Sequence, residues 1–276
     1  QEGERMVVRA RRSRFALATL PAAEFPTVEE ISPLQTLEVS QQDFKRLLEK
    51  THFSMAQQDV RYYLNGTLLE TAPKLLRSVA TDGHRLALCE IELGSSGQTG
   101  QQVIIPRKGV LELQRILGSE EQNLQLAIGT NHVRVQIGEV RFTSKLIDGR
   151  FPDYTRVIPS APERKVSAVR EDLRQALQRA AILSNEKYRG IRFALKPNSL
   201  VIQAHNPEQE EAEEEVEVSY DGEPMEIGFN VNYLLDALGA IDGEQVEIGL
   251  TDGNSSCLIR SPADDRARFV VMPMRL

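Results

Sequence analysis

Hydrophobic residues recur at helical spacing in two matched segments of the chain, residues 41–53 and residues 170–183. In each segment they stand at i, i+3, i+4 and i+7, the spacing of one face of an amphipathic helix. The residues on these two faces are Phe44, Leu47, Leu48 and Thr51 in the first segment, and Leu173, Ala176, Leu177, Ala180 and Ala181 in the second. Each pattern predicts a helix that packs on a core.

The segments after these two helices also recur. Ser54 and Ser184 stand 130 residues apart, and each precedes a polar turn and an alternating segment that begins with arginine, residues 61–64 and 192–195. These segments predict strands, and Asn65-Gly66 predicts a hairpin turn. A second pair of helices is expected at residues 106–117 and 230–241, followed by short strands such as residues 246–250. Two helices among many short strands indicate an α+β fold with mostly antiparallel sheets.

The N-terminal segment resembles the end of a repeat. Residues 14–26 match residues 141–152 in their Arg-Phe, Leu and Phe-Pro positions, and residues 5–9 are expected to form a strand. The chain is therefore interpreted as two complete repeats of about 125 residues after the tail of a third. The expected domains are 1–34, 35–157 and 158–276. The parent protein is expected to extend roughly 90 to 100 residues further at its N-terminus.

Composition and charge are those of a folded protein whose acidity is local. Hydrophobic residues make up 41% and charged residues 26%, and the net charge is −7. Seven glutamates between residues 208 and 217 account for all of that excess. Cys89 and Cys257 stand alone, which suits a reducing compartment. No apolar run is long enough to span a membrane, so we expect a cytoplasmic protein without a membrane partner.

Candidate chemistry is sparse. Residues 184–187 fit S-x-x-K, but the pattern is more typical of a helix end followed by a turn. Asp82, His84 and Arg85 lie close together, and a carboxylate that orients a histidine is a common catalytic element. No serine or cysteine nucleophile accompanies them, so a turn at Asp82-Gly83 is the simpler interpretation. The glutamate run could hold a metal but is more typical of a solvated segment. We expect no catalytic residue, cofactor or metal.

Basic side chains occupy the polar faces of three expected helices. They are Lys45, Arg46 and Lys50; Arg107, Lys108 and Arg115; and Arg170, Arg174 and Arg179. If these faces converged, they would contact nucleic-acid phosphates without reading bases. The apolar C-terminal segment 269–276 is unusual for a terminus and suits either a binding groove or a strand end in its own core.

Several motifs together identify the chain as similar to one family, the bacterial sliding clamps that serve as beta subunits of DNA polymerase III. The motifs are DVRYYLNG at 59–66, ATDGHRL at 80–86, PRKG at 106–109, DGRFPDY at 148–154, SNEK at 184–187, NPEQEEAE at 206–213 and VMPMRL at 271–276. The resemblance implies three similar domains per chain and a head-to-tail homodimer. Such a ring encircles double-stranded DNA without sequence preference and holds the polymerase there, with no chemistry of its own.

The resemblance also implies a groove for partner peptides, often a glutamine followed by hydrophobic residues. Its first part would consist of Leu64, Thr81, Gly83, His84, Arg85, Leu86, Pro152, Arg156, Val157, Val270 and Met272. Its second part would consist of Tyr188, Asn230, Tyr233, Asn254, Ser256, Pro273, Met274, Arg275 and Leu276. Arg85 and Tyr188 would offer an amphipathic wall, while Leu86, Val157 and Met272 would take an apolar side chain. Asn254 departs from the family, which more often has an apolar residue there, and Tyr188 stands where phenylalanine also occurs.

Further residues and partners are implied by the same resemblance. The DNA-facing set would be Gln58, Arg61, Tyr62, Tyr63, Arg107 and Lys108, and the dimer contact would use Phe15, Ile182 and Leu183. Implied partners are the polymerase alpha subunit, the clamp loader delta subunit, and other polymerases and repair proteins, with the clamp in the cytoplasm at the nucleoid. Without most of a first domain, this chain is not expected to close a ring. Two other interpretations are a hydrolase or nuclease that uses Asp82, His84 and the glutamate run, and a peptide-binding scaffold unrelated to DNA.

Overall fold

The computed structural model describes residues 3–27, 30–94, 100–160 and 162–275, which fall into two compact units, Gln1–Ser32 and Pro33–Leu276. The first unit holds a hairpin of β1 (Arg5–Ala10) and β2 (Ser13–Ala18), followed by a 3-10 turn, η1 (Ala22–Glu24). The strand expected at residues 5–9 is therefore confirmed. Phe15 and Leu17 on β2 are 56% and 53% exposed, so the hairpin buries little of its own apolar surface.

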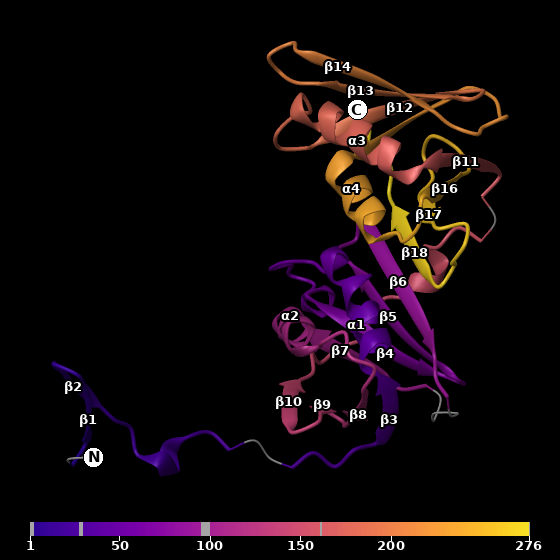
Figure 1. Ribbon diagram of the computed structural model, residues 1–276. Coiled ribbons are helices and arrows are strands. Elements are labelled where there is room, and N and C mark those ends of the chain that lie inside the picture. Colours follow the sequence, from indigo (N-terminus) through magenta and orange to yellow (C-terminus); the bar gives the residue numbers. More distant parts are fainter. Residues whose placement is uncertain (1–2, 28–29, 95–99, 161, 276) are drawn as a thin grey trace. The chain divides into compact units, whose positions relative to one another are not determined.

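The second unit is built around a continuous antiparallel sheet of eight strands (Figure 1). In spatial order they are β11 (Arg164–Val169), β16 (Gln245–Leu250), β17 (Cys257–Arg260), β18 (Ala267–Val271), β6 (Arg85–Glu92), β5 (Leu75–Thr81), β4 (Gly66–Ala72) and β7 (Gln102–Pro106). At its centre β18 pairs with β6, from Ala267 opposite Cys89 to Val271 opposite Arg85. The two predicted repeats thus share one sheet, joined along a contact that we call the seam.

Two four-stranded antiparallel sheets complete this unit. One has the order β10 (Val140–Lys145), β9 (His132–Ile137), β8 (Asn123–Ile128) and β3 (Gln35–Ser40). The other has the order β14 (Glu211–Glu217), β13 (Ser199–His205), β12 (Gly190–Lys196) and β15 (Met225–Asn230). The antiparallel α+β fold expected from the sequence is confirmed.

Each predicted repeat contributes two adjacent helices. They are α1 (Gln41–Glu49) with α2 (Arg107–Ile116), and α3 (Arg170–Ile182) with α4 (Val231–Ala240). The predicted apolar faces are buried, with Phe44 and Leu173 fully inaccessible to solvent. Side-chain caps start two of the helices, because Ser40 accepts from the Asp43 N–H and Asn230 from the Asn232 N–H.

Three local predictions need correction. Residues 61–64 form a 3-10 turn, η3 (Tyr62–Leu64), rather than a strand, and Gly66 begins β4 rather than closing a hairpin. A Cβ on Gly66 would lie 2.4 Å from the Ile105 carbonyl oxygen, so the glycine allows β4 to lie against β7. α1 ends at Glu49, four residues early, and a separate turn, η2 (His52–Ser54), comes after it. The glutamate run forms most of strand β14.

Ion pairs reinforce the seam on the side of α1. Arg46 contacts Asp242 at 2.7 Å and Asp264 at 2.9 Å, and Lys50 contacts Asp242 at 2.6 Å. Lys50 also donates to the Ala240 carbonyl oxygen. Two of the cations predicted to face a nucleic acid are therefore matched by carboxylates within the chain.

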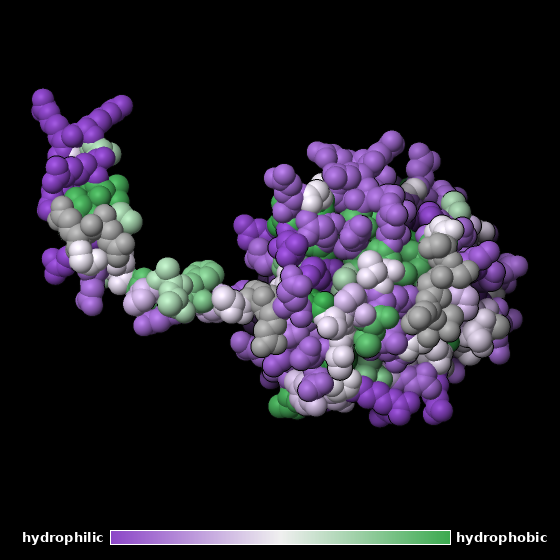
Figure 2. All heavy atoms as spheres, turned by 90° about the horizontal axis from the view of Figure 1, so that it is seen from below, coloured by the Kyte–Doolittle hydropathy of each residue, from purple (hydrophilic) through white to green (hydrophobic). Residues whose placement is uncertain are grey.

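The visible surface of residues 33–276 is mostly hydrophilic, with scattered apolar patches (Figure 2). Among the described residues, no helix is both long and apolar enough to cross a membrane.

Candidate functional site

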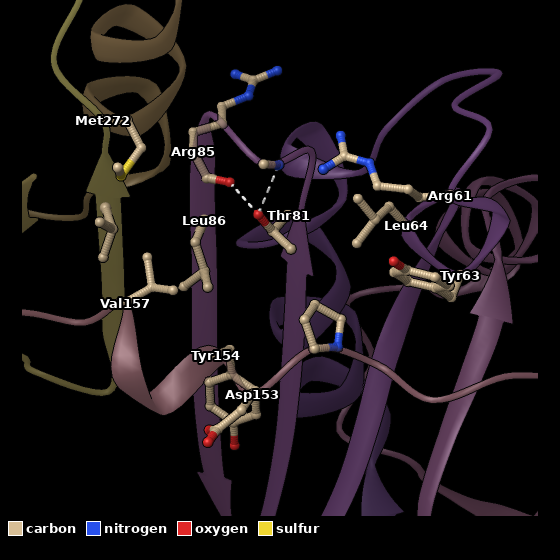
Figure 3. A pocket seen from close by; sticks show the side chains of 13 residues that line it. Arg61, Tyr63, Leu64, Thr81, Arg85, Leu86, Asp153, Tyr154, Val157 and Met272 are labelled. Carbon is tan, nitrogen blue, oxygen red and sulfur yellow. Dashed lines mark hydrogen bonds between the residues drawn. The ribbon is translucent and has the colours of Figure 1, made fainter.

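An apolar pocket opens where the seam meets the ends of several strands (Figure 3). It encloses about 190 Å³. Nine predicted groove residues line it: Leu64, Thr81, Gly83, Arg85, Leu86, Pro152, Val157, Val270 and Met272. Val270 and Met272 come from β18 and the segment after it, whereas the first seven belong to the central repeat. Residues nearly 200 positions apart in the chain therefore complete one cavity.

Two predicted members of this part of the groove lie outside the pocket wall. The ring of His84 stacks on Tyr233, with centroids 6.5 Å apart and planes at 20°. Arg156 is 85% exposed and pairs with Asp153 at 2.9 Å. The His84 carbonyl oxygen nevertheless accepts the Met272 N–H at 2.9 Å, so its backbone anchors the C-terminal segment.

Four wall residues were not predicted for the groove: Arg61, Tyr63, Asp153 and Tyr154. Arg61 and Tyr63 were expected to face DNA. The signal that could have found them is position in the sequence, because each lies within three residues of a predicted groove residue, Leu64 or Pro152. Arg61 forms a two-point contact with Asp59, and these hydrogen bonds lower the pKa of Asp59 to about 2.

The turn at residues 81–85 is fixed by its own side chains. Asp82 Oδ1 accepts the N–H groups of His84 and Arg85 at 2.9 and 3.0 Å. Thr81 Oγ1 donates to the Arg85 carbonyl oxygen and accepts the Gly83 N–H. Gly83 has a φ of +89°, which disfavours any side chain. Asp82 thus orients backbone groups, not the His84 ring, and the pair lacks the geometry of a hydrolase.

A buried polar network supports the pocket at Tyr154, which begins the 3-10 turn η4 (Tyr154–Arg156). The Tyr154 hydroxyl donates to Glu70 and accepts from Arg77 Nη1 at 2.7 Å. Arg77 also contacts Glu70 at 2.8 Å and, through Nε, Glu90 at 2.6 Å. Burial and the Glu70 contact raise the pKa of Tyr154 to about 12. Burial alone would raise the pKa of Glu70, but its hydrogen bonds hold it below its usual value.

A second, more polar depression of about 470 Å³ lies beside the C-terminal segment. Asn254, Pro273, Met274 and Arg275 were predicted and line it, together with Arg192, Glu226, Ile227, Gly228 and Gly253. The Met274 N–H donates to the Gly228 carbonyl oxygen at 2.9 Å, so the segment binds the free edge of β15.

The other predicted residues of this part lie around the depression rather than in its wall. Tyr188 is 57% exposed, with Lys187 Nζ 5.1 Å from its ring centroid, and its carbonyl oxygen accepts from Asn230 Nδ2. Tyr233 stacks against His84 and Arg85, and Ser256 is half-buried. Leu276 lies outside the described residues.

The residues predicted to face DNA lie at two different places in the structure. Gln58, Arg107 and Lys108 line a shallow depression at the start of α2, while Arg61 and Tyr63 line the apolar pocket. Tyr62 is 56% exposed and packs edge-on against Tyr63 with centroids 5.8 Å apart.

Most of the predicted helix cations are matched inside the chain. Arg174 pairs with Glu171, and Arg179 pairs with Glu214 of the glutamate run at 2.8 Å. Lys108 is exposed and forms no ion pair with a described residue.

The predicted dimer residues fall in separate units. Ile182, at the end of α3, is 77% exposed, and Leu183 beside it is half-buried. Phe15 lies on the N-terminal hairpin. Within the described residues, no group of three or more His, Cys, Asp or Glu side chains could hold a metal ion. Ser184 donates to the Ala181 carbonyl oxygen in a turn after α3, as the simpler interpretation of residues 184–187 predicts.

Comparison with known proteins shows which family has this sequence and fold. Residues 38–153 match the central domain of the DNA polymerase III beta subunit, and residues 155–275 match its C-terminal domain. The beta sliding clamp of Pseudomonas aeruginosa is 54% identical over 275 residues, covering 100% of this chain and 75% of that protein. The beta sliding clamp of Escherichia coli K12 is also 54% identical, with the same coverage.

Solved structures agree with these relatives. The crystal structure of the P. aeruginosa DNA polymerase III beta subunit superposes with a TM-score of 0.96 at 54% identity, covering 100% of this chain and 75% of that one. A P. aeruginosa sliding clamp bound to griselimycin gives a TM-score of 0.94 at 54% identity and the same coverage.

Repeated two-helix units joined through a shared sheet, with an apolar pocket at the seam, define a DNA sliding clamp, a processivity factor without chemistry of its own. The chain belongs to the beta subunit family of DNA polymerase III. Both alternatives, the hydrolase and the scaffold unrelated to DNA, are thereby set aside.

Proposed function

We propose that the apolar pocket and the polar depression form one groove in which this clamp captures short peptide segments of its partners. The observation that carries the proposal is that consecutive residues line the two cavities: Met272, 41% exposed and with its N–H bonded to the turn at residues 81–85, lines the apolar pocket, and Pro273 lines the polar depression. An apolar pocket beside a polar surface suits a peptide with a hydrophobic anchor and a polar neighbour. The bound griselimycin in a related clamp is consistent with such a surface.

The partners proposed for this groove are the polymerase alpha subunit, the clamp loader delta subunit, and other polymerases and repair proteins. Double-stranded DNA is the other proposed partner. The clamp would encircle it without sequence preference. Lys108 supports this assignment, because an exposed cation that no carboxylate of the described residues pairs with can contact phosphate. Gln58, Tyr62 and Arg107 would accompany it.

The assembly proposed for the full-length protein is a homodimeric ring in the cytoplasm at the nucleoid. Phe15 and Ile182 support it, because each exposes more than half of a large apolar side chain. Leu183 would extend the same contact. We retain the division into domains 1–34, 35–157 and 158–276 as part of this proposal.

Fluorescence polarisation of a labelled peptide tests the groove. The probe carries a glutamine followed by leucine and phenylalanine, and it is titrated with the chain and with a variant that ends at Met272. We expect a Kd in the micromolar range, about −8 kcal/mol, and at least tenfold weaker binding by the shortened chain. A scrambled peptide is the control. Equal binding of both peptides, or equal binding by both chains, would contradict the proposal.

A further inference from the structure

The guanidinium of Arg85 is held by groups from both sides of the seam. Its Nε contacts Asp82 at 3.1 Å, and its Nη2 donates to the Phe53 carbonyl oxygen at 2.6 Å, both within the central repeat. Its Nη1 donates to Asp236, which lies on α4 of the C-terminal repeat. The guanidinium also stacks on the Tyr233 ring, 4.5 Å from its centroid.

These contacts decide what Arg85 presents to the apolar pocket. Its charge faces two carboxylates, and its side chain is only 14% exposed. Figure 3 shows the guanidinium pointing away from Leu86 and from the apolar end of the pocket. Arg85 still lines the pocket, and because its guanidinium points away, it offers its backbone and hydrocarbon stem there. The charged end of the amphipathic wall expected from the sequence is bonded to Asp82 and Asp236.

Asp236 is the one charged group that α4 supplies to this arrangement. It is 44% exposed and forms no other ion pair with a described residue. Asp82, by contrast, is occupied by two backbone N–H groups in addition to Arg85. Loss of Asp236 would therefore remove the more available of the two carboxylates and let the guanidinium turn toward solvent or into the pocket.

We propose that Asp236 is a positioning residue of the peptide groove, which acts by holding Arg85 with its stem against the pocket. The proposal rests on the proposed peptide-binding function. A wall that is ordered before binding loses less conformational freedom when the peptide binds. An Arg85 released by the loss of Asp236 must be ordered again at that moment, so affinity falls without any lost contact between Asp236 and the peptide.

The seam offers a matched control. Asp242 also joins the two repeats, but through Arg46 and Lys50, and it does not line the pocket. It is 58% exposed, close to the exposure of Asp236. If Asp236 acted only by keeping the repeats together, Asp242→Ala would have the same effect on peptide binding.

A double-mutant cycle on the full chain tests the proposal with the labelled peptide described above. The chains are the unchanged protein, Asp236→Ala, Arg85→Ala, the double variant and Asp242→Ala, each checked for folding by urea unfolding. We expect Asp236→Ala to weaken binding about threefold to tenfold when Arg85 is present, and less than about twofold when Arg85 is alanine. Asp242→Ala is expected to stay within about twofold of the unchanged chain.

The positioning role, and not the proposed function, would be overturned by the same loss for Asp236→Ala in both backgrounds, or by a loss for Asp242→Ala as large as that for Asp236→Ala. An Asp236→Ala chain that binds as well as the unchanged one would also overturn it. If the unchanged chain itself did not bind the peptide, the proposed function would fail, and this inference would fail with it.

Discussion

The two halves of the proposed groove, the apolar pocket and the polar depression, are built in different ways. The apolar pocket is walled by strand ends and turns whose polar groups are already bonded to one another, as in the network of Tyr154, Glu70 and Arg77. The polar depression is walled by residues of β12 and β15, by residues 253–254 and by the C-terminal segment. The Met274 N–H bonds this segment to the Gly228 carbonyl oxygen on the edge strand β15. The ion pair of the depression, Arg192 with Glu226, is 43% and 64% exposed.

This difference predicts which of the two cavities contributes to the stability of the fold and which contributes to binding alone. Partly buried polar groups that bond to one another support the apolar pocket, and removing one of them leaves its partners short of a hydrogen bond. Exposed ion pairs at the polar depression contribute little to stability because water screens them. Single substitutions at the apolar pocket should therefore alter both folding and binding, whereas single substitutions at the polar depression should alter binding slightly and folding hardly at all.

The largest expected effect comes from a charge inside the apolar pocket. Val157→Glu would place a carboxylate where a peptide anchor must exclude water, so we expect at least thirtyfold weaker peptide binding, about 2 kcal/mol. Fluorescence polarisation measures it. Val169→Glu is the matched control, because Val169 is 41% exposed against 40% for Val157 but lies away from the groove. Similar losses for both variants would show that the pocket does not bind the anchor.

Removal of one hydroxyl should weaken the support of the apolar pocket. Tyr154→Phe leaves Glu70 and Arg77 without a shared partner, and we expect the free energy of unfolding to fall by about 1 to 2 kcal/mol. Urea denaturation measures the change. Tyr62→Phe, at an exposed tyrosine with no hydrogen bond to a described residue through its hydroxyl, should change stability by less than about 0.5 kcal/mol. An unchanged midpoint for Tyr154→Phe would contradict the supporting role of the network.

Lowering the pH should remove a contribution to stability that Glu70 makes beside the apolar pocket. The pKa of folded Glu70 lies below its usual value, so its contribution to stability is full above about pH 4.5 and is lost as pH falls through the folded pKa. Glu70→Gln should therefore be less stable than the unchanged chain at pH 7, and the difference should shrink as pH falls through the folded pKa of Glu70. Glu226→Gln, in the polar depression, removes only an exposed ion pair and should change stability by less than about 0.5 kcal/mol at pH 7. If the free energies of unfolding of Glu70→Gln and of the unchanged chain differed by the same amount at every pH, this assignment would be contradicted.

The smallest expected effect concerns Asn254. Its side chain lines the polar depression and forms no hydrogen bond with a described residue. Asn254→Val adds apolar surface there, and we expect about twofold to threefold tighter peptide binding with no change in stability. Asn254→Ser serves as the control for losing the amide. Weaker binding by the valine variant would indicate that the amide contacts the peptide directly.

Much of the fold could be predicted because it depends on local periodicity. The helices at 170–183 and 230–241 were placed to within about a residue, since their apolar faces follow the helical repeat. The segment 61–64 was assigned wrongly, because four residues of alternating pattern do not distinguish a strand from a 3-10 turn. There the hydrogen bonds of Asn65 with Asp59 shape the backbone instead.

The candidate site was less predictable than the fold. Arg46 and Asp264 are 218 positions apart, so a basic helix face looked free when it was already paired across the seam. Arg85 was expected to help form an amphipathic wall, and no local pattern reveals that its guanidinium pairs with Asp236, 151 positions away. The resemblance located the pocket residues, but the partners of each charge required the tertiary structure.

The central place of β18 in the eight-stranded sheet has a consequence for the order of events during synthesis. Its partner β6 leaves the ribosome about 180 residues earlier and must wait with an unpaired edge until Ala267–Val271 emerges. Pairing at such sequence separation forms slowly and exposes the waiting strand to wrong partners. A nascent chain thus acquires a complete pocket only when Met272 has emerged, and earlier lengths cannot compete with finished clamps for binding proteins.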